Sequence, residues 1–225
     1  MSTQTDRNLA RHHQWSVADI ADVLEAGFLS AEAELRREQA VQGLDARSEV
    51  ELHPLLQEIL EAASIGATRE VRYPSESRRR RQTEGRRCDL VLTPDGNPLV
   101  EPQQKQTLFA PNHAVELEDA FWLEVKCVAQ FTSEGPNSSY SSDLLSTVRK
   151  DVFKLAADQS ILHAGLLIML FVASEDVAEH DLRIWQERCL EQTLPIAAPA
   201  SRVVPITDRL GNQCCCLSLY PVRHL

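Results

Sequence analysis

The chain has 225 residues, enough for one well-packed domain with an appendage or for two small domains at most. Hydrophobic residues make up 43% and charged residues 25%, which is typical of a soluble globular protein, and no apolar run reaches the roughly eighteen residues of a membrane span. A net charge of −10 argues against a protein that coats nucleic acid over its whole surface. Residues 1–13 are polar and lack a secretory signal, so we expect a cytoplasmic protein with no membrane partner.

The N-terminal third is predicted to be helical. Residues 14–44 carry apolar side chains at helical spacing after Ser16, a candidate N-cap, and we expect one helix or two helices broken near Gly27. A second amphipathic helix is predicted from Ser48 to Ala63. These patterns predict an N-terminal helical extension over residues 1–47 and a main domain over residues 48–225.

Extended segments follow the second helix. We predict strands over Arg69–Tyr73 and Arg87–Leu92, the second of which ends at the turn Pro94–Asn97. Asp89 enters this second, mostly apolar strand. By alternation it should share a face with Val91, opposite Cys88, Leu90 and Leu92.

The strand Phe121–Ala129 carries the most informative pattern in the chain. Glu124 and Lys126 lie two residues apart in an otherwise apolar run, so both should point to one face while Leu123, Val125 and Cys127 point to the other. Burying an unpaired charge is costly, so we expect a metal, a substrate or a counter-charge at that face.

The remaining sequence alternates between strands and helices. The composition of residues 133–142 indicates a loop. The elements expected after it are a helix over 142–158, a strand over 165–172, a helix over 176–192, and strands near 202–206 and 213–219. Together these patterns predict an α/β fold with a mixed central sheet flanked by helices.

The order helix, strand, strand with Asp89, strand with Glu124 and Lys126, helix, strand resembles the PD-(D/E)XK phosphodiesterase superfamily over about residues 48–175. The resemblance implies a restriction-endonuclease-like αβββαβ core that cleaves phosphodiester bonds. Two departures are visible: Cys88 precedes the aspartate where the family has proline, and 35 residues separate Asp89 from Glu124.

The resemblance also implies a site. Asp89 and Glu124 would bind Mg²⁺, with Mn²⁺ as a substitute, and Lys126 would position the attacking water. Many members add a glutamate from the first helix, and here Glu49 and Glu51 both qualify, although Glu51 also fits a capping box with the residue that precedes the helix.

Two groups of basic residues could hold nucleic-acid phosphates. The first is an arginine stretch of local charge +5 between residues 78 and 87, and the second is the pair of lysines on the helix after the charged strand. The candidate nucleic-acid-binding residues are Arg78, Arg79, Arg80, Arg81, Arg86, Arg87, Lys150 and Lys154. For both groups the alternative is a solvated surface without a partner.

Taken together, these features predict a magnesium-dependent endodeoxyribonuclease, with DNA a better expected substrate than RNA. The resemblance suggests a role in defence against foreign DNA, and targeting by self-assembly or by a helicase or ATPase partner. A rival interpretation is a non-catalytic nuclease-like subunit that binds a protein or nucleic acid. A third is an unrelated α/β enzyme in which Glu124 and Lys126 form an internal ion pair.

Histidines and cysteines receive structural interpretations. His53, His113 and His163 lack metal-ligand spacing, so we interpret them as structural or surface residues. The six cysteines form no C-x-x-C pair, which favours reduced, buried thiols over redox chemistry.

Overall fold

The two most apolar strands of the sequence lie side by side at the centre of a six-stranded sheet. In the computed structural model, which describes residues 13–76, 86–100 and 113–223, β3 (Phe121–Ala129) pairs in parallel with β6 (His163–Val172). The strand order is β1-β2-β3-β6-β8-β7, and the other neighbouring pairs are antiparallel. The outer strands are β1 (Gly66–Arg72), β2 (Arg87–Thr93), β7 (Ala200–Pro205) and β8 (Cys214–Val222).

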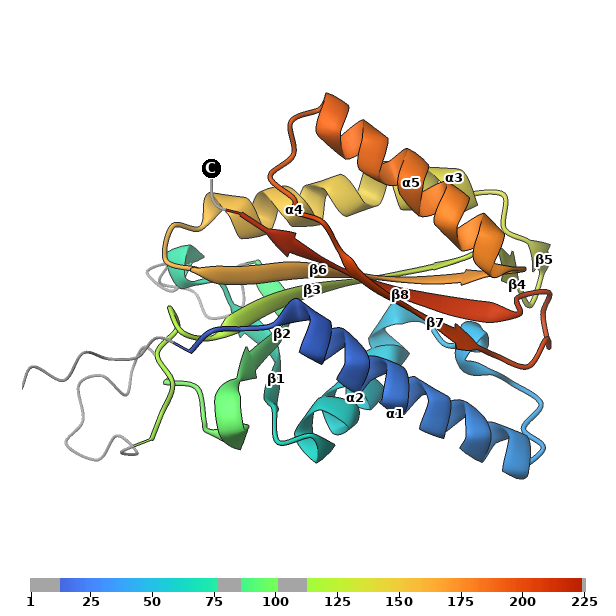
Figure 1. Ribbon diagram of the computed structural model, residues 1–225, viewed down its shortest axis with the longest axis horizontal. Helices are drawn as coiled ribbons and strands as arrows, with labels where there is room; N and C mark the ends of the chain where they lie inside the picture. The colour runs from blue at the N-terminus through green and yellow to red at the C-terminus, as the bar shows by residue number, and fades with distance from the viewer. Residues whose placement is uncertain (1–12, 77–85, 101–112, 224–225) are drawn as a thin grey trace, which may run out of the picture.

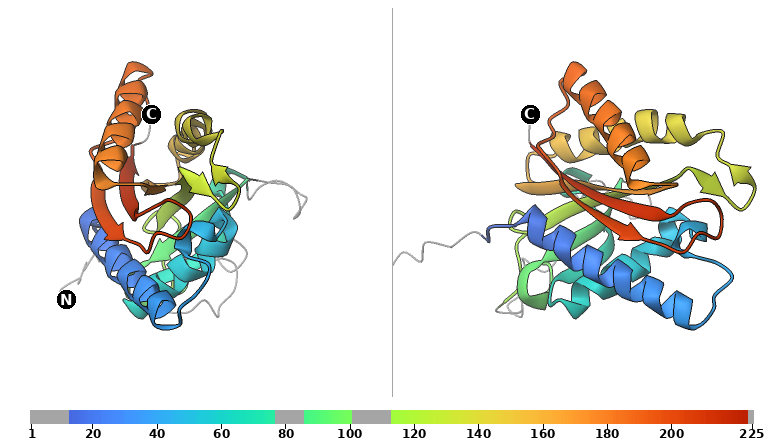
Figure 2. Two further views of the ribbon diagram at one scale, coloured as in Figure 1. Left: turned by 90° about the vertical axis from the view of Figure 1, so that its right-hand side faces the viewer. Right: turned by 45° about the vertical axis from the view of Figure 1, so that its right-hand side comes forward.

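Helices cover both faces of this sheet (Figures 1 and 2). The first face carries α1 (Val17–Arg37) and α2 (Glu49–Ala62), and the second carries α4 (Val148–Ala157) and α5 (Glu175–Glu191). The small elements are the hairpin β4 (Phe131–Thr132) and β5 (Gly135–Pro136), the short helix α3 (Tyr140–Ser142), a π-helical turn (Asp143–Thr147), and 3-10 turns at Leu44–Ala46, Pro74–Glu76 and Pro94–Gly96. The predicted α/β architecture with a mixed sheet is confirmed.

Each face of the sheet has its own apolar core, as strand alternation requires. Leu123 and Val125 of β3 pack with Phe28 of α1 on one side. Trp122 and Val128 pack with side chains of α4 and α5 on the other side. Glu124 therefore belongs, by its position in β3, to the α4–α5 side.

The N-terminal segment forms one helix, and a break near Gly27 does not occur. Ser16 caps it, accepting a hydrogen bond from the backbone N–H of Asp19 at 3.2 Å. Gly27 has a packing role instead, because a Cβ there would lie only 2.4 Å from Ile59 of α2. The glycine lets the two helices approach closely, and α1 shares its core with α2 and the sheet.

The six cysteines are free thiols, as expected. Burial raises the pKa of the Cys127 thiol to about 12 and that of Cys214 to about 11, which keeps both protonated. Among the described residues, no helix combines the length and the apolar character needed to cross a membrane.

Candidate metal and phosphate site

The site lies where β2 and β3 separate. Ladder pairing between these strands covers only Leu90–Leu92 of β2. At the next residue, the Asp89 carboxylate accepts a hydrogen bond from the backbone N–H of Val125 at 2.8 Å. The Asp89 side chain thus replaces a backbone partner for the Val125 amide, and it lies on the strand next to the one that carries Glu124.

The alternation expected in β2 fails at one residue. Leu90 packs on the α1–α2 side, opposite Val91, as alternation predicts. Cys88, however, packs on the α4–α5 side together with Val91. The irregularity coincides with Glu70 on β1, which has a left-handed φ of 57° and interrupts the pairing between β1 and β2. The assignment of Cys88 to the opposite face from Val91 was therefore wrong.

Glu124 is held in a buried, negatively charged environment. Its side chain is 2% exposed, Oε1 accepts a hydrogen bond from the Tyr73 hydroxyl, and Oε2 lies 3.3 Å from Lys154 Nζ. Burial and then the charge of Asp89 raise the pKa of Glu124 to about 8, although Lys154 and Tyr73 oppose that rise. Burial raises the pKa of Tyr73 as well, so its hydroxyl remains a donor.

Lys126 pairs with helix α2. Its Nζ lies 3.0 Å from Glu49 Oε2, and the same oxygen accepts a hydrogen bond from the backbone N–H of Cys127 at 3.0 Å. Burial lowers the pKa of Lys126, but the charge and hydrogen bond of Glu49, together with the charges of Asp151 and Asp89, more than offset this, so the pKa is raised overall. Lys126 therefore remains a cation.

Glu124 and Lys126 have partners on opposite helical layers. Among the described residues, Lys126 forms its ion pair with Glu49 of α2, and Glu124 forms its ion pair with Lys154 of α4. The internal Glu124–Lys126 ion pair of the third interpretation is not formed. Asp89 lies close enough to Glu124 to shift its pKa, which also contradicts that interpretation.

The two candidate glutamates of α2 have different environments. Glu49 contacts Lys126, as described above, whereas Glu51 caps the helix. Glu51 Oε2 accepts hydrogen bonds from the Ser48 backbone N–H at 2.8 Å and from the Ser48 hydroxyl at 2.7 Å. The structure therefore brings Glu49, and not Glu51, to the other charged groups.

Helix α4 supplies a lysine that was predicted and an aspartate that was not. Lys154 Nζ lies 2.8 Å from Asp151 Oδ1 in addition to its contact with Glu124. The spacing of three residues between Asp151 and Lys154 is a signal that could have identified the pair. Tyr73, at the end of β1, offered no comparable signal. Lys150 is exposed on the same helix.

The arginine stretch is only partly described. Arg78, Arg79, Arg80 and Arg81 lie outside the described residues. Arg86 and Arg87 are exposed at the start of β2, and Arg87 Nη1 donates to the backbone carbonyl of Glu70 at 2.9 Å. Arg87 therefore lies at the β1–β2 edge, on the strand that carries Asp89.

Charge does not balance within this site. It contains four carboxylates against two ammonium groups, which leaves two negative charges when all are ionised. These groups are Glu49, Asp89, Glu124 and Asp151, with Lys126 and Lys154. Two excess negative charges on oxygen ligands match one hard divalent cation.

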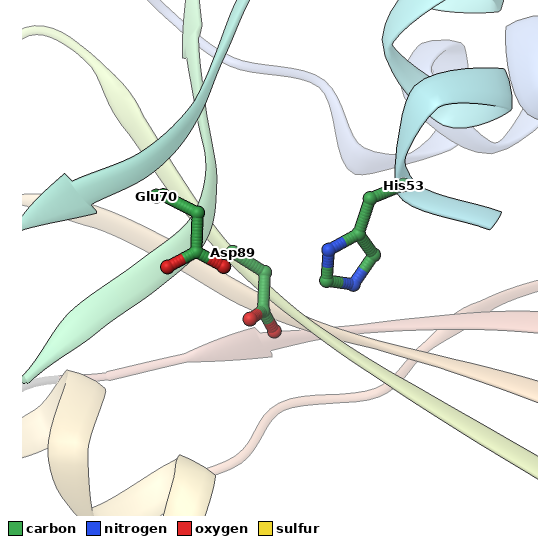
Figure 3. Close-up of side chains that lie close together, drawn as sticks. All are labelled: His53, Glu70 and Asp89. Carbon is green, nitrogen blue, oxygen red and sulfur yellow. The ribbon is translucent and has the colours of Figure 1, made fainter. Parts of the chain in front are cut away.

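A histidine lies at the edge of the same site. His53, Glu70 and Asp89 each offer a ligand atom, and these atoms lie within 4.8 Å of one another (Figure 3). His53 had been interpreted as structural or surface, because its partners in sequence are 17 and 36 residues away and no local spacing indicates them. It is buried, which excludes the surface interpretation.

Comparisons with protein-family models, with curated proteins and with solved structures found no match. Function therefore has to be inferred from the side chains that the fold brings together.

Proposed function

We propose that the chain is a divalent-metal-dependent nuclease of the PD-(D/E)XK type, with DNA as its preferred substrate. The observation that carries the proposal is the convergence of Asp89, Glu124 and Lys126, which come from neighbouring strands, with Glu49 and Lys154 from helices on opposite faces of the sheet. Buried or half-buried charged groups with shifted pKa values, such as Glu124 and Lys154, are concentrated at functional sites, which supports this proposal.

The order of elements supports the same assignment. From α2 onward the chain runs through β1, β2 and β3, then α4, then β6, and the four strands are adjacent in the order β1-β2-β3-β6. This is the αβββαβ order of the proposed restriction-endonuclease-like core. Strands β7 and β8 extend the sheet beyond it, and α1 adds the N-terminal layer.

Asp89 and Glu124 would hold Mg²⁺ or Mn²⁺, and the site fits such an ion. The donors are carboxylate oxygens, which these cations prefer. Burial and then the charge of Asp89 raise the pKa of Glu124 to about 8, and a cation between the two carboxylates would favour the ionised form of Glu124. When bound, the ion supplies positive charge to the phosphoryl oxygens during hydrolysis.

The chain's own residues supply orientation and further charge. Lys126, held by Glu49, presents an ammonium that can orient a water or a phosphoryl oxygen. Tyr73 fixes one oxygen of Glu124 by donating to it. Lys154 lies beside the other oxygen and would offset phosphate charge once Glu124 has another cationic partner.

A non-catalytic subunit is the second candidate, and one observation favours it. Lys126 already forms an ion pair with Glu49, and Lys154 forms one with Glu124. These ion pairs neutralise part of the negative charge without a metal. In that case the site would bind neither Mg²⁺ nor Mn²⁺, and the fold would present a surface to a protein or nucleic acid. Metal binding and cleavage therefore decide between the two candidates.

The test is cleavage of supercoiled plasmid, single-stranded DNA and RNA with Mg²⁺ or Mn²⁺. Wild type is compared with Asp89→Asn and Lys126→Ala, and Glu58→Gln, an exposed carboxylate on α2, is the matched control. We expect metal-dependent nicking of the circular plasmid, lost in the two site variants and kept in the control. No cleavage together with no metal binding by calorimetry would reject the nuclease and favour the subunit.

A catalytic chain of this acidity needs a way to reach DNA. The net charge of −10 disfavours broad contact with the phosphate backbone, so we propose targeting by self-assembly or by a helicase or ATPase partner, with defence against foreign DNA as the setting. Mass measurement of the purified protein and affinity capture from its host test the two routes. A monomer that captures no such partner would reject both.

A further inference from the structure

Helix α4 presents an exposed aromatic ring beside the charged site. The helix lies over β3 and β6 (Figure 1), and its large apolar side chains Val148, Val152 and Leu155 are buried. Phe153, in contrast, is 39% exposed, and it is the one aromatic residue among the large exposed hydrophobic side chains of the described residues. It directly precedes Lys154, whose ammonium contacts Glu124. The ring is therefore available to a partner next to the site.

Two cationic side chains flank this ring. Arg149 and Lys150 are exposed one helical turn before Phe153. The guanidinium of Arg149 lies over the ring, with its Cζ atom 5.5 Å from the ring centre. Residues three and four apart are neighbours on a helix surface, so Lys150 is adjacent to both Phe153 and Lys154. The α4 patch, which we define as Arg149, Lys150 and Phe153, thus continues into the charged site through Lys154.

The two cations of the α4 patch are free to bind an anion. Among the described residues, neither Arg149 nor Lys150 forms an ion pair with a carboxylate, although the chain has 33 acidic residues against 23 basic ones. Other exposed arginines on helices do form such pairs, for example Arg183 with Glu187 at 3.3 Å on α5. The α4 patch is therefore a small, positively charged and partly aromatic area on an acidic protein.

Single-stranded DNA matches both properties of this area. Its phosphates are complementary to the two cations, and its unpaired bases offer flat faces that stack on an aromatic ring. Bases within a duplex are already stacked on one another, so a duplex would use the cations but not the ring. A strand bound on the α4 patch would also lie next to Lys154 and hence next to Glu124.

We propose that the α4 patch binds single-stranded DNA, with one base stacked on Phe153 and neighbouring phosphates held by Arg149 and Lys150. The preferred substrate is then DNA with a single-stranded segment. The cleavage of that segment rests on the nuclease proposed above, whereas binding by the patch does not. The patch also gives a protein of net charge −10 a local contact with DNA that avoids its acidic surface.

The test is fluorescence anisotropy with a fluorescein-labelled DNA strand, alone and within a duplex, and with the RNA strand of the same sequence. Full-length protein is titrated in a chelator, and the Asp89→Asn protein is titrated with Mg²⁺, so that binding is measured without cleavage. The variants are Phe153→Ala, Phe153→Trp, Arg149→Gln and Lys150→Gln. Circular dichroism checks that each of them folds.

Two exposed residues of α5 provide matched controls. Arg188→Gln removes a cation, and Leu190→Ala removes an apolar side chain that is 68% exposed. Both lie on the helix that covers the same face of the sheet as α4. Neither change should alter binding to the single strand.

We expect Phe153→Ala to weaken binding to the single strand about fivefold or more, and Phe153→Trp to restore it. Phe153→Ala should leave binding to the duplex and the salt dependence unchanged. Arg149→Gln and Lys150→Gln should each reduce the slope of log K against log salt concentration by about 0.7, because each removes one phosphate contact.

Several outcomes would overturn the α4 patch as the binding surface: no binding to the single strand in either buffer, normal binding by Phe153→Ala, or equal loss of single-strand and duplex binding in that variant. Tighter binding of the RNA strand would overturn the choice of DNA. Plasmid cleavage by a protein whose Phe153→Ala variant binds single strands normally refutes the patch and leaves the nuclease. Single-strand binding that depends on Phe153, without metal-dependent cleavage, refutes the nuclease and leaves the patch.

Discussion

Glu124 predicts an inverted pH dependence of stability for the metal-free protein. Its pKa is raised from an ordinary 4.5 to about 8 by burial and by the charge of Asp89. The folded state therefore holds this proton more tightly than the unfolded chain does. The stability associated with Glu124 is fully present below about pH 4.5 and is lost as the pH rises through 8.

The magnitude follows from the pKa difference. At 1.36 kcal/mol per unit, a rise from 4.5 to about 8 corresponds to up to about 5 kcal/mol of unfolding free energy. The variant Glu124→Gln is neutral at every pH and escapes this loss. Its unfolding free energy relative to wild type should therefore increase by up to about 5 kcal/mol between about pH 4.5 and 8.5.

Urea unfolding at half-unit steps of pH, in buffer with a chelator, measures the difference directly. Glu58→Gln controls for the removal of one surface carboxylate. Addition of Mg²⁺ or Mn²⁺ at pH 8 should recover stability in wild type and less in Glu124→Gln, because a cation that binds the ionised form stabilises the folded state. A difference between wild type and Glu124→Gln that stays constant across this range would refute the raised pKa of Glu124.

Three further predictions test the site and its support. Lys126→Ala should lower DNA cleavage by about 10²-fold or more without loss of folding, as measured by plasmid nicking and circular dichroism; equal cleavage would remove Lys126 from the chemistry. Glu49→Gln should also lower cleavage because it releases Lys126, whereas Glu51→Ala should leave cleavage unchanged and lower the melting temperature by loss of the helix cap; the reverse pattern would exchange their roles. Gly27→Ala should destabilise the protein by about 1–3 kcal/mol in urea unfolding, because its Cβ would lie 2.4 Å from Ile59; a neutral effect would mean that the two helices pack less closely.

The strands of this protein were more predictable from sequence than the irregularities between them. The limits of β3 match the predicted segment Phe121–Ala129 because its ends coincide with the ends of an apolar run. Of the two alternatives for the N-terminal segment, the break near Gly27 was wrong, since a glycine can serve helix packing as well as helix termination. The side change at Cys88 could not be predicted, because it accompanies a left-handed backbone at Glu70 that no glycine or asparagine signals.

The site was predictable where its groups share a strand pattern and not where they depend on tertiary packing. Asp89 and Glu124 stand out because each is a charge within an apolar strand. The choice between Glu49 and Glu51 depended on the rotation of α2 relative to the sheet, which the helical pattern alone left open. For His53 the surface alternative was wrong because the residue is buried, and its nearness to Glu70 and Asp89 could not be predicted because these neighbours come from two other elements.

The distribution of charge bears on whether the site is catalytic or merely structural. A buried charge network that serves only stability is commonly no better than apolar packing, so a scaffold gains most when every charge is paired. Here the ammonium of Lys154 is shared between Glu124 and Asp151. Within the described part of the chain, Asp89 accepts a hydrogen bond from a backbone N–H and is not paired with a cationic side chain. With the pKa of Glu124 raised to about 8 by burial and by the charge of Asp89, ionising this carboxylate is expected to lower the stability of the metal-free fold, and the same ionised carboxylates would attract a divalent cation. A site arranged at the expense of stability in this way is expected for function, which is why we favour the nuclease over the non-catalytic subunit.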